Sequence, residues 1–145
     1  MGQVTKTLVW VLFFAFVLGG MAMAQDKAKI GVIVVDVQRD FTKFKNGSLA
    51  VDGTDESYMK AVAENTKRLK EAGYPIYATQ DWHPKNHASF FTKKKRKKAF
   101  DVIKLHGKDQ VLWPPHCVQK TPGAEILLEN KLFTAVVKKG MDAQY

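Results

Sequence analysis

The alternation of apolar and polar positions divides the chain into three strand-like runs and one helical segment. Residues 30–35 form a nearly continuous β-branched run, which is typical of a strand buried on both faces of a parallel sheet. Residues 75–79 and 132–137 are two further strand candidates. Between the first two strands, helical spacing runs from a capping residue, Thr54, to about Ala72. A strand, a helix and a strand in that order predict a right-handed crossover and a parallel sheet, and hence an α/β protein.

Two other segments carry weaker signals. Residues 84–110 are expected to form an irregular, basic insertion, and residues 122–125 are expected to open a short helix because a proline stands at its start. Neither segment changes the expected fold class.

The N-terminal segment has the three parts of a secretory signal. Lys6 supplies a positive charge, the run from Leu8 to Leu18 is apolar throughout, and a small-x-small pattern ends at Ala24. We therefore expect residues 1–24 to be removed on export, and residues 25–145 to act in the periplasm or as a secreted domain without stable membrane association. An uncleaved membrane anchor is the alternative, because no charge stands between Leu8 and Ala24.

The positive charge of the chain is concentrated in one place. Of 145 residues, 23 are Lys or Arg and 14 are Asp or Glu, which gives a formal net charge of +9. The run Lys93–Lys98 consists entirely of cations, and outside it the charge is nearly balanced. We interpret this run as a solvated loop and expect no nucleic-acid partner; attraction to anionic polymers or lipid is the alternative. Hydrophobic residues make up 46% of the chain, which excludes wholesale disorder.

The single cysteine excludes an internal disulfide framework and any metal site built from several cysteines. It is Cys117, and it directly follows His116. Neighbours in an extended chain point to opposite faces, so this histidine is poorly placed to be its base. We therefore interpret Cys117 as a small buried residue rather than a nucleophile.

Polar residues stand where the strand candidates end. Asp36, Asp81 and Lys139 each occupy such a position, and ligands of open parallel sheets bind beyond the carboxyl ends of the strands. We therefore expect two carboxylates and an ammonium group at one edge of the sheet, although strands often end in polar residues for other reasons. Phe41 and Trp113 are aromatic residues near this edge, and they would either stack on a flat ring or pack the core.

A metal site is the chemistry that the spacing favours. Asp81 and His83 lie two residues apart, so their side chains share one face of an extended segment. A third ligand could come from His87 or from His116. One carboxylate and two imidazoles suit a divalent metal with positions open for water or substrate. The alternative is a surface loop with scattered histidines.

Several blocks of sequence resemble the nicotinamidases of the isochorismatase-like cysteine hydrolases. They occur in the family's order over about residues 28–145, and together they are far more specific than the Asp-x-His pair alone. The blocks are residues 36–41, 47–51, 78–84, 86–90, 112–119, 121–124 and 139–140.

The resemblance implies a doubly wound, mainly parallel α/β sheet of the Rossmann-like, three-layer type, with helices on both faces. It also implies the hydrolysis of nicotinamide to nicotinate and ammonia by an Asp–Lys–Cys triad. Asp36 matches the aspartate that takes the thiol proton, and Lys139 matches the lysine that favours the thiolate and the developing oxyanion.

The resemblance assigns the remaining site residues as well. The ligands of zinc, or of another divalent metal such as Fe²⁺ or Mn²⁺, would be Asp81, His83 and His116, with His87 close behind them. The aromatic residues that sandwich the substrate ring would be Phe41 and Trp113.

The chain also departs from the family pattern. Arg39 replaces a common asparagine, and Lys120 replaces a common glycine at a position expected to have positive φ. Cys117 matches a non-catalytic cysteine, whereas the family's nucleophile lies some tens of residues after the Lys139-Gly140 step. We therefore expect the N-terminal portion of a hydrolase domain, its C-terminal part missing, that binds metal and forms no thioester.

The sequence leaves two alternative functions and the oligomeric state open. Another amide hydrolase of the same family and a non-catalytic metal-binding fragment are the alternative functions. Homo-oligomerisation is compatible with the sequence.

Overall fold

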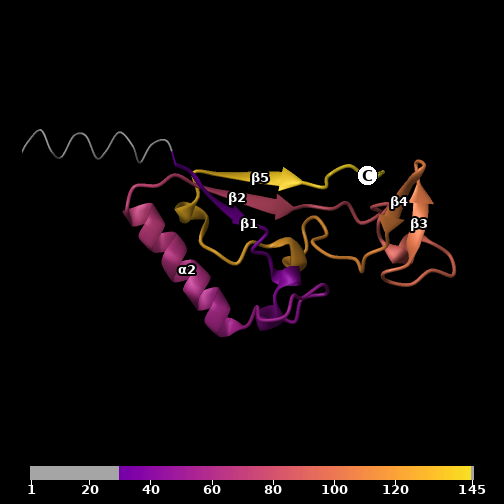
Figure 1. The fold of residues 1–145 in the computed structure, drawn as a ribbon, viewed down its shortest axis with the longest axis horizontal. Coiled ribbons are helices and arrows are strands. Elements are labelled where there is room, and N and C mark those ends of the chain that lie inside the picture. Colours follow the sequence, from indigo (N-terminus) through magenta and orange to yellow (C-terminus); the bar gives the residue numbers. More distant parts are fainter. Residues whose placement is uncertain (1–29, 145) are drawn as a thin grey trace, which may run out of the picture.

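A three-stranded parallel sheet forms the centre of the molecule. The computed structural model describes residues 30–144, and the predicted export signal, residues 1–24, lies outside them. The strands are β1 (Val32–Val35), β2 (Ile76–Asp81) and β5 (Ala135–Lys139), in the order β1-β2-β5. Both neighbouring pairs are parallel, and Figure 1 shows the three arrows pointing the same way. The predicted strand–helix–strand order and the α/β class are confirmed.

The connection between β1 and β2 is the helix α2 (Glu56–Glu71). Its N-cap is Asp55, whose carboxylate accepts a hydrogen bond from the Tyr58 N–H at 2.9 Å. The predicted cap, Thr54, is therefore wrong by one residue. Its hydroxyl instead donates to the Val51 carbonyl at 2.6 Å and so closes the turn before the helix.

The core lies between the sheet and this helix. Val34, Ile76 and Ala78 on the sheet are buried together with Leu128, and Val62 of α2 packs against them. Within residues 30–144, α2 is the one α-helix, and it covers one face of the sheet.

The opposite face of the sheet carries apolar side chains that are exposed to solvent. Ile33 is 64% exposed, Val35 63% and Val137 56%. The described residues therefore form two of the three layers that the resemblance implies, namely the sheet and the helix on one of its faces.

The third strand begins later than predicted. Its expected range was 132–137, but Leu132 belongs to a 3-10 turn (Asn130–Leu132), and the strand runs from Ala135 to Lys139. The short helix predicted at 122–125 is present as a 3-10 turn, Pro122–Ala124.

The expectation of an irregular segment over residues 84–110 is wrong in its last part. An antiparallel hairpin forms there from β3 (Val102–Leu105) and β4 (Lys108–Val111). His106 and Gly107 make its turn, both with positive φ, which is the geometry that two-residue hairpins favour. The strands have four residues each, and half of those residues are polar without the regular alternation by which a strand is recognised.

The basic run Lys93–Lys98 precedes the hairpin and is largely exposed, as predicted for a solvated loop. Figure 1 shows the hairpin at the end of the molecule away from α2. No helix within residues 30–144 has the length and apolar character needed to cross a membrane.

Candidate functional site

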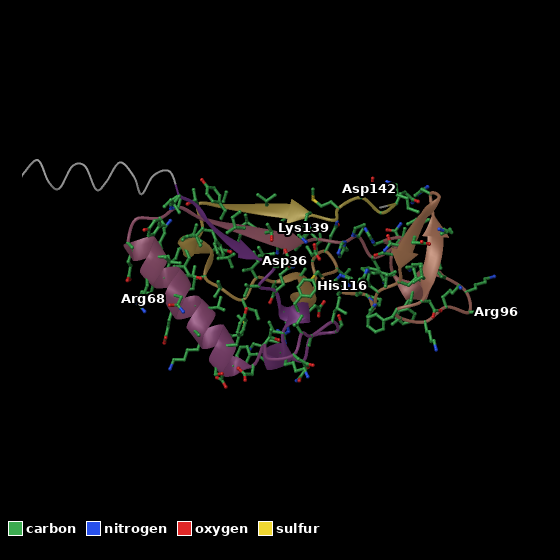
Figure 2. The ribbon with its side chains drawn as sticks, in the orientation of Figure 1. Asp36, Arg68, Arg96, His116, Lys139 and Asp142 are labelled. Carbon is green, nitrogen blue, oxygen red and sulfur yellow. The ribbon has the colours of Figure 1, made fainter. Side chains whose placement is uncertain are left out.

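The three strands bring their polar end residues to one edge of the sheet. Asp36 directly follows β1, while Asp81 and Lys139 are the last residues of β2 and β5 and lie opposite each other in register. The Lys139 ammonium lies 2.9 Å from Asp36 Oδ2 and also forms an ion pair with Asp81 Oδ1. Figure 2 shows Asp36, Lys139 and His116 gathered where the strands end. The predicted meeting of these residues is confirmed.

Asp36 is held by a residue that the sequence analysis did not identify. The Thr79 hydroxyl donates to Asp36 Oδ1 at 2.7 Å, and the Asp36 N–H donates to that hydroxyl oxygen at 3.2 Å. Asp36 itself has a φ of 50°, a left-handed conformation that aspartate tolerates better than most residues. The register that pairs Val35 with Thr79 places this hydroxyl beside the aspartate.

The charges at this edge stabilise one another. Burial by itself would raise the pKa of Asp81, but hydrogen bonds from His83 and Lys139, together with their charge, lower the pKa to about 2. Burial would likewise lower the pKa of Lys139, but its hydrogen bonds to Asp36 and Asp81 raise the pKa above its usual value. When both histidines are neutral, one ammonium between two carboxylates leaves an excess of negative charge, which favours an additional cation.

Asp81, His83 and His116 form a group with the spacing of a metal site. One potential ligand atom from each lies within 4.8 Å of the other two. Asp81 Oδ2 is 3.4 Å from His83 Nε2 and 4.0 Å from His116 Nε2. Two ligand atoms that are each about 2.1 Å from a tetrahedral ion lie about 3.4 Å apart. The three side chains therefore need only a small closure to share one divalent ion.

Both imidazoles are oriented by backbone carbonyls. His83 Nδ1 lies 2.9 Å from the Gly140 oxygen, and His116 Nδ1 lies 2.7 Å from the Pro114 oxygen. A carbonyl only accepts hydrogen bonds, so each Nδ1 carries a proton, and in the neutral form of each ring Nε2 is the nitrogen left to bind a metal. Burial also lowers the pKa of His116, which favours the neutral form that binds metals. The donor set therefore fits a divalent metal.

The structure also selects between the two candidates for the third ligand. His87 lies next to the site, with its ring centroid 4.5 Å from that of His83, and its Nδ1 is hydrogen-bonded to Ser89 Oγ at 2.8 Å. The group with metal-site spacing contains His116 in its place. The geometry thus favours His116 as the ligand and His87 as a neighbour behind it.

Phe90 is a second residue of the site that the sequence analysis did not single out. It is fully buried, and its ring packs edge-on against His83 and His116, with centroids 5.7 Å and 5.5 Å apart. This apolar wall lowers the local dielectric constant and strengthens the interactions between the charged groups. Its position in the 86–90 sequence block was the available signal.

A cleft of about 540 Å³ opens beside the metal group, and Phe41, Trp113 and Lys139 line it. The Phe41 ring lies 5.5 Å from the His116 ring, and Trp113 packs edge-on against Phe100 at 5.9 Å. The two aromatic residues expected to hold a flat ring therefore border the same cleft as the metal group, and their role in binding stays a prediction.

Cys117 has the environment of a buried structural residue. It is 0% exposed, and its backbone N–H donates to Asp40 Oδ2 at 2.7 Å. Burial raises the pKa of its thiol, and the nearby carboxylates of Asp40, Asp81 and Asp36 raise it further. A thiol held in the protonated form is a poor nucleophile, which agrees with the interpretation of Cys117 as a small buried residue.

Comparison with known proteins adds a family context. No protein-family model matches the chain. It is 43% identical over 111 residues to the nicotinamidase of Acinetobacter baylyi, an alignment that covers 75% of this chain and 49% of that protein. The chain spans about half the length of the curated relatives it matches.

The solved structures that are similar to this chain also include a nicotinamidase and a pyrazinamidase. The yeast nicotinamidase bound to the inhibitor nicotinaldehyde is similar with a TM-score of 0.68 and 28% identity, over 79% of this chain and 58% of that one. The pyrazinamidase of Pyrococcus horikoshii in complex with zinc has a TM-score of 0.59 and 35% identity, over 78% and 52%. The predicted resemblance to nicotinamidases and the α/β fold class are confirmed.

Proposed function

We propose that this chain forms the metal-binding part of a nicotinamidase-type amidohydrolase, which converts nicotinamide to nicotinate and ammonia. One observation carries the proposal: Asp81, His83 and His116 converge beside the ion-paired Asp36 and Lys139 at the carboxyl ends of three parallel strands. The names of the similar proteins, which are nicotinamidases and a pyrazinamidase, support this substrate class.

Zinc is the ion that we propose for the site. A carboxylate with two imidazoles is a donor set that zinc accepts with positions left open, and Fe²⁺ or Mn²⁺ would also accept it. When bound, the ion would supply a Lewis acid that holds the pyridine nitrogen of the substrate and water. The zinc in the Pyrococcus horikoshii pyrazinamidase supports this choice of metal.

The charged pair beside the metal group would handle the proton and the developing charge. Because the Thr79 hydroxyl occupies Asp36 Oδ1, the oxygen Oδ2 next to Lys139 is the one available to accept a proton. The Lys139 ammonium lies against both carboxylates, so it would favour a thiolate and stabilise negative charge on the amide oxygen. Phe41 and Trp113 would hold the flat ring in the adjoining cleft.

The nucleophile in this proposal is a thiolate that Cys117 does not supply. The chain contains one cysteine, and that thiol is buried with a raised pKa. We therefore expect the 145-residue chain by itself to bind metal and to release no ammonia. A non-catalytic metal-binding role is the second candidate function, and the protonation of Cys117 favours it.

Zinc titration tests the site directly. The unaltered chain is compared with His83→Ala and with a control, His106→Ala, which removes an exposed histidine in the hairpin turn. We expect the control to bind zinc like the unaltered chain and His83→Ala to bind more weakly by at least about 10- to 100-fold, because loss of a residue that only orients a ligand already costs that much. Equal binding by all three proteins would eliminate the metal site.

The substrate assignment needs its own measurement. Nicotinamide is added to the zinc-loaded chain while tryptophan fluorescence and ammonia are followed. A fluorescence change that disappears in His83→Ala supports the substrate class, and its absence leaves metal binding alone. Ammonia release above a zinc-only blank would contradict the expected lack of turnover.

A further inference from the structure

The backbone of Asp81 lies where the sheet loses one of its strands. β1 ends at Val35, which pairs with Thr79, whereas β2 continues for two more residues beside β5. The Trp82 N–H donates to the Lys139 carbonyl at 2.9 Å, on the β5 side. Hydrogen-bonding groups of successive strand residues point to alternate sides, so those of Asp81 point towards the space beyond β1. Buried backbone groups without partners are costly, so they need a substitute for that strand.

The side chain of Gln38 is that substitute. It is 0% exposed, its Oε1 accepts from the Asp81 N–H at 2.7 Å, and its Nε2 donates to the Asp81 carbonyl at 2.8 Å. The amide thus bonds both backbone groups that flank the Cα of Asp81, a task that takes two peptide groups of a neighbouring strand in a parallel sheet. A second bond from Nε2, to the Ala124 carbonyl at 2.9 Å, completes its hydrogen bonding.

The position of Gln38 links this clamp to the rest of the site. Gln38 stands two residues after Asp36, and its own N–H donates to the Asp36 carbonyl at 2.7 Å. The loop that carries Asp36 therefore also holds Asp81. A glutamate at this position would keep the acceptor for the Asp81 N–H but lose the donor, and an asparagine is one methylene group shorter.

We propose that Gln38 is a positioning residue for the metal centre, which fixes the Asp81 carboxylate between His83 and His116 by binding the Asp81 backbone on both sides of its Cα. The inference rests on the proposed function, because it takes Asp81 to be a metal ligand. Without these hydrogen bonds from Gln38, the end of β2 is held in the sheet only by β5. The backbone of Asp81 can then shift, and its carboxylate shifts with it.

The test uses the full 145-residue chain with Gln38→Met, which keeps a similar length and removes all the amide hydrogen bonds. The matched control is Gln80→Met, because Gln80 is another buried glutamine whose Nε2 donates to the Ala124 carbonyl, at 2.8 Å, but not to Asp81. Co²⁺ affinity is measured by competition with a chelator, the Co²⁺ absorption spectrum reports ligand geometry, and hydrogen exchange of the Asp81 amide reports the clamp.

For Gln38→Met we expect about a 10-fold or greater loss of Co²⁺ affinity, an altered Co²⁺ spectrum and loss of protection at the Asp81 amide. For Gln80→Met we expect unchanged protection at the Asp81 amide and a Co²⁺ affinity within about 3-fold of the unaltered chain. The reason is that a residue near a metal site affects metal affinity chiefly by orienting a ligand, and Gln80 makes its hydrogen bond to Ala124 rather than to Asp81. Equal Co²⁺ affinity in the two variants would overturn the proposal.

A second variant covers the case in which Gln38→Met does not fold. Gln38→Glu keeps the size and the acceptor, so we expect it to fold with a protected Asp81 amide and weakened Co²⁺ binding. Failure of both variants to fold would assign Gln38 a purely structural role and overturn the inference. If the unaltered chain binds Co²⁺ no better than His83→Ala, the proposed function fails instead, and the exchange of the Asp81 amide still decides whether the clamp exists.

Discussion

Gly140 is the position where a single methyl group should disturb the metal centre most directly. Its φ is 65°, and its carbonyl oxygen accepts the hydrogen bond from His83 Nδ1. A Cβ at this position would lie 2.3 Å from His83 Cε1 and 2.6 Å from Nδ1. The variant Gly140→Ala therefore places a methyl group closer than van der Waals contact to the His83 ring, which the Gly140 carbonyl orients.

The size of the effect follows from these distances. Carbon atoms in contact sit about 3.5 Å apart, so the His83 ring would have to retreat by about 1 Å. Metal–ligand distances in proteins hold to within about 0.2 Å, and loss of a partner that orients a ligand typically costs about 10- to 100-fold in affinity. We therefore expect Gly140→Ala to weaken zinc binding by about 1.4 to 2.8 kcal/mol. The left-handed alanine itself would cost a further 1–2 kcal/mol, roughly, of folding stability.

A matched control separates the clash from the backbone strain. Gly107 in the hairpin turn has a φ of 80°, and a Cβ there would meet no atom within 4 Å. Gly107→Ala should thus lose stability in thermal unfolding but keep the zinc affinity of the unaltered chain, as measured by competition with a chromogenic chelator. If Gly140→Ala also keeps its zinc affinity, the contact between Gly140 and His83 does not orient a metal ligand and the reasoning fails.

Two further predictions concern single side chains. Cys117 is fully buried with a raised thiol pKa, so it should react with iodoacetamide only after denaturation; mass spectrometry checks this, and rapid labelling of the folded chain would contradict the assignment. Lys120 has a φ of 62°, so Lys120→Gly should relieve strain and raise the free energy of unfolding by up to about 1 kcal/mol, as measured in urea; a destabilised variant would show that the lysine side chain contributes more than the strain costs.

Local patterns in the sequence were sufficient to predict the elements that carry the charged residues. The β-branched run before Asp36, the strand candidate that ends just before Asp81 and the strand–helix–strand order were enough to predict a parallel sheet with polar residues at one edge. The Asp-x-His spacing put Asp81 and His83 on one face because side chains of an extended chain alternate with a period of two. These patterns are local and periodic, so they can be recognised in the sequence without knowing which distant residues are in contact.

Local signals failed where the chain lacks periodicity. The hairpin of β3 and β4 was missed because its strands are short and lack regular alternation of apolar and polar residues. The start of α2 was misplaced because Thr54 and Asp55 are both good capping residues. Sequence preference did not decide between adjacent caps. The Asp55 carboxylate reaches the Tyr58 N–H, while the Thr54 hydroxyl is already bonded within the preceding turn.

The assembly of the site depends on contacts between distant residues, which are seen in the folded chain and not in the sequence pattern. The fold brought His116 to Asp81 and His83, as the resemblance implied and the spacing alone left open. It also put Thr79 against Asp36 and set the Gln38 amide against the backbone of Asp81, 43 residues away. It also showed that Gly140 must lack a side chain because the His83 ring occupies that space. Such contacts join loops far apart in the sequence, and no repeating pattern along the chain encodes them. They are fixed by the register of the parallel strands and by the requirement that each buried polar group find a partner.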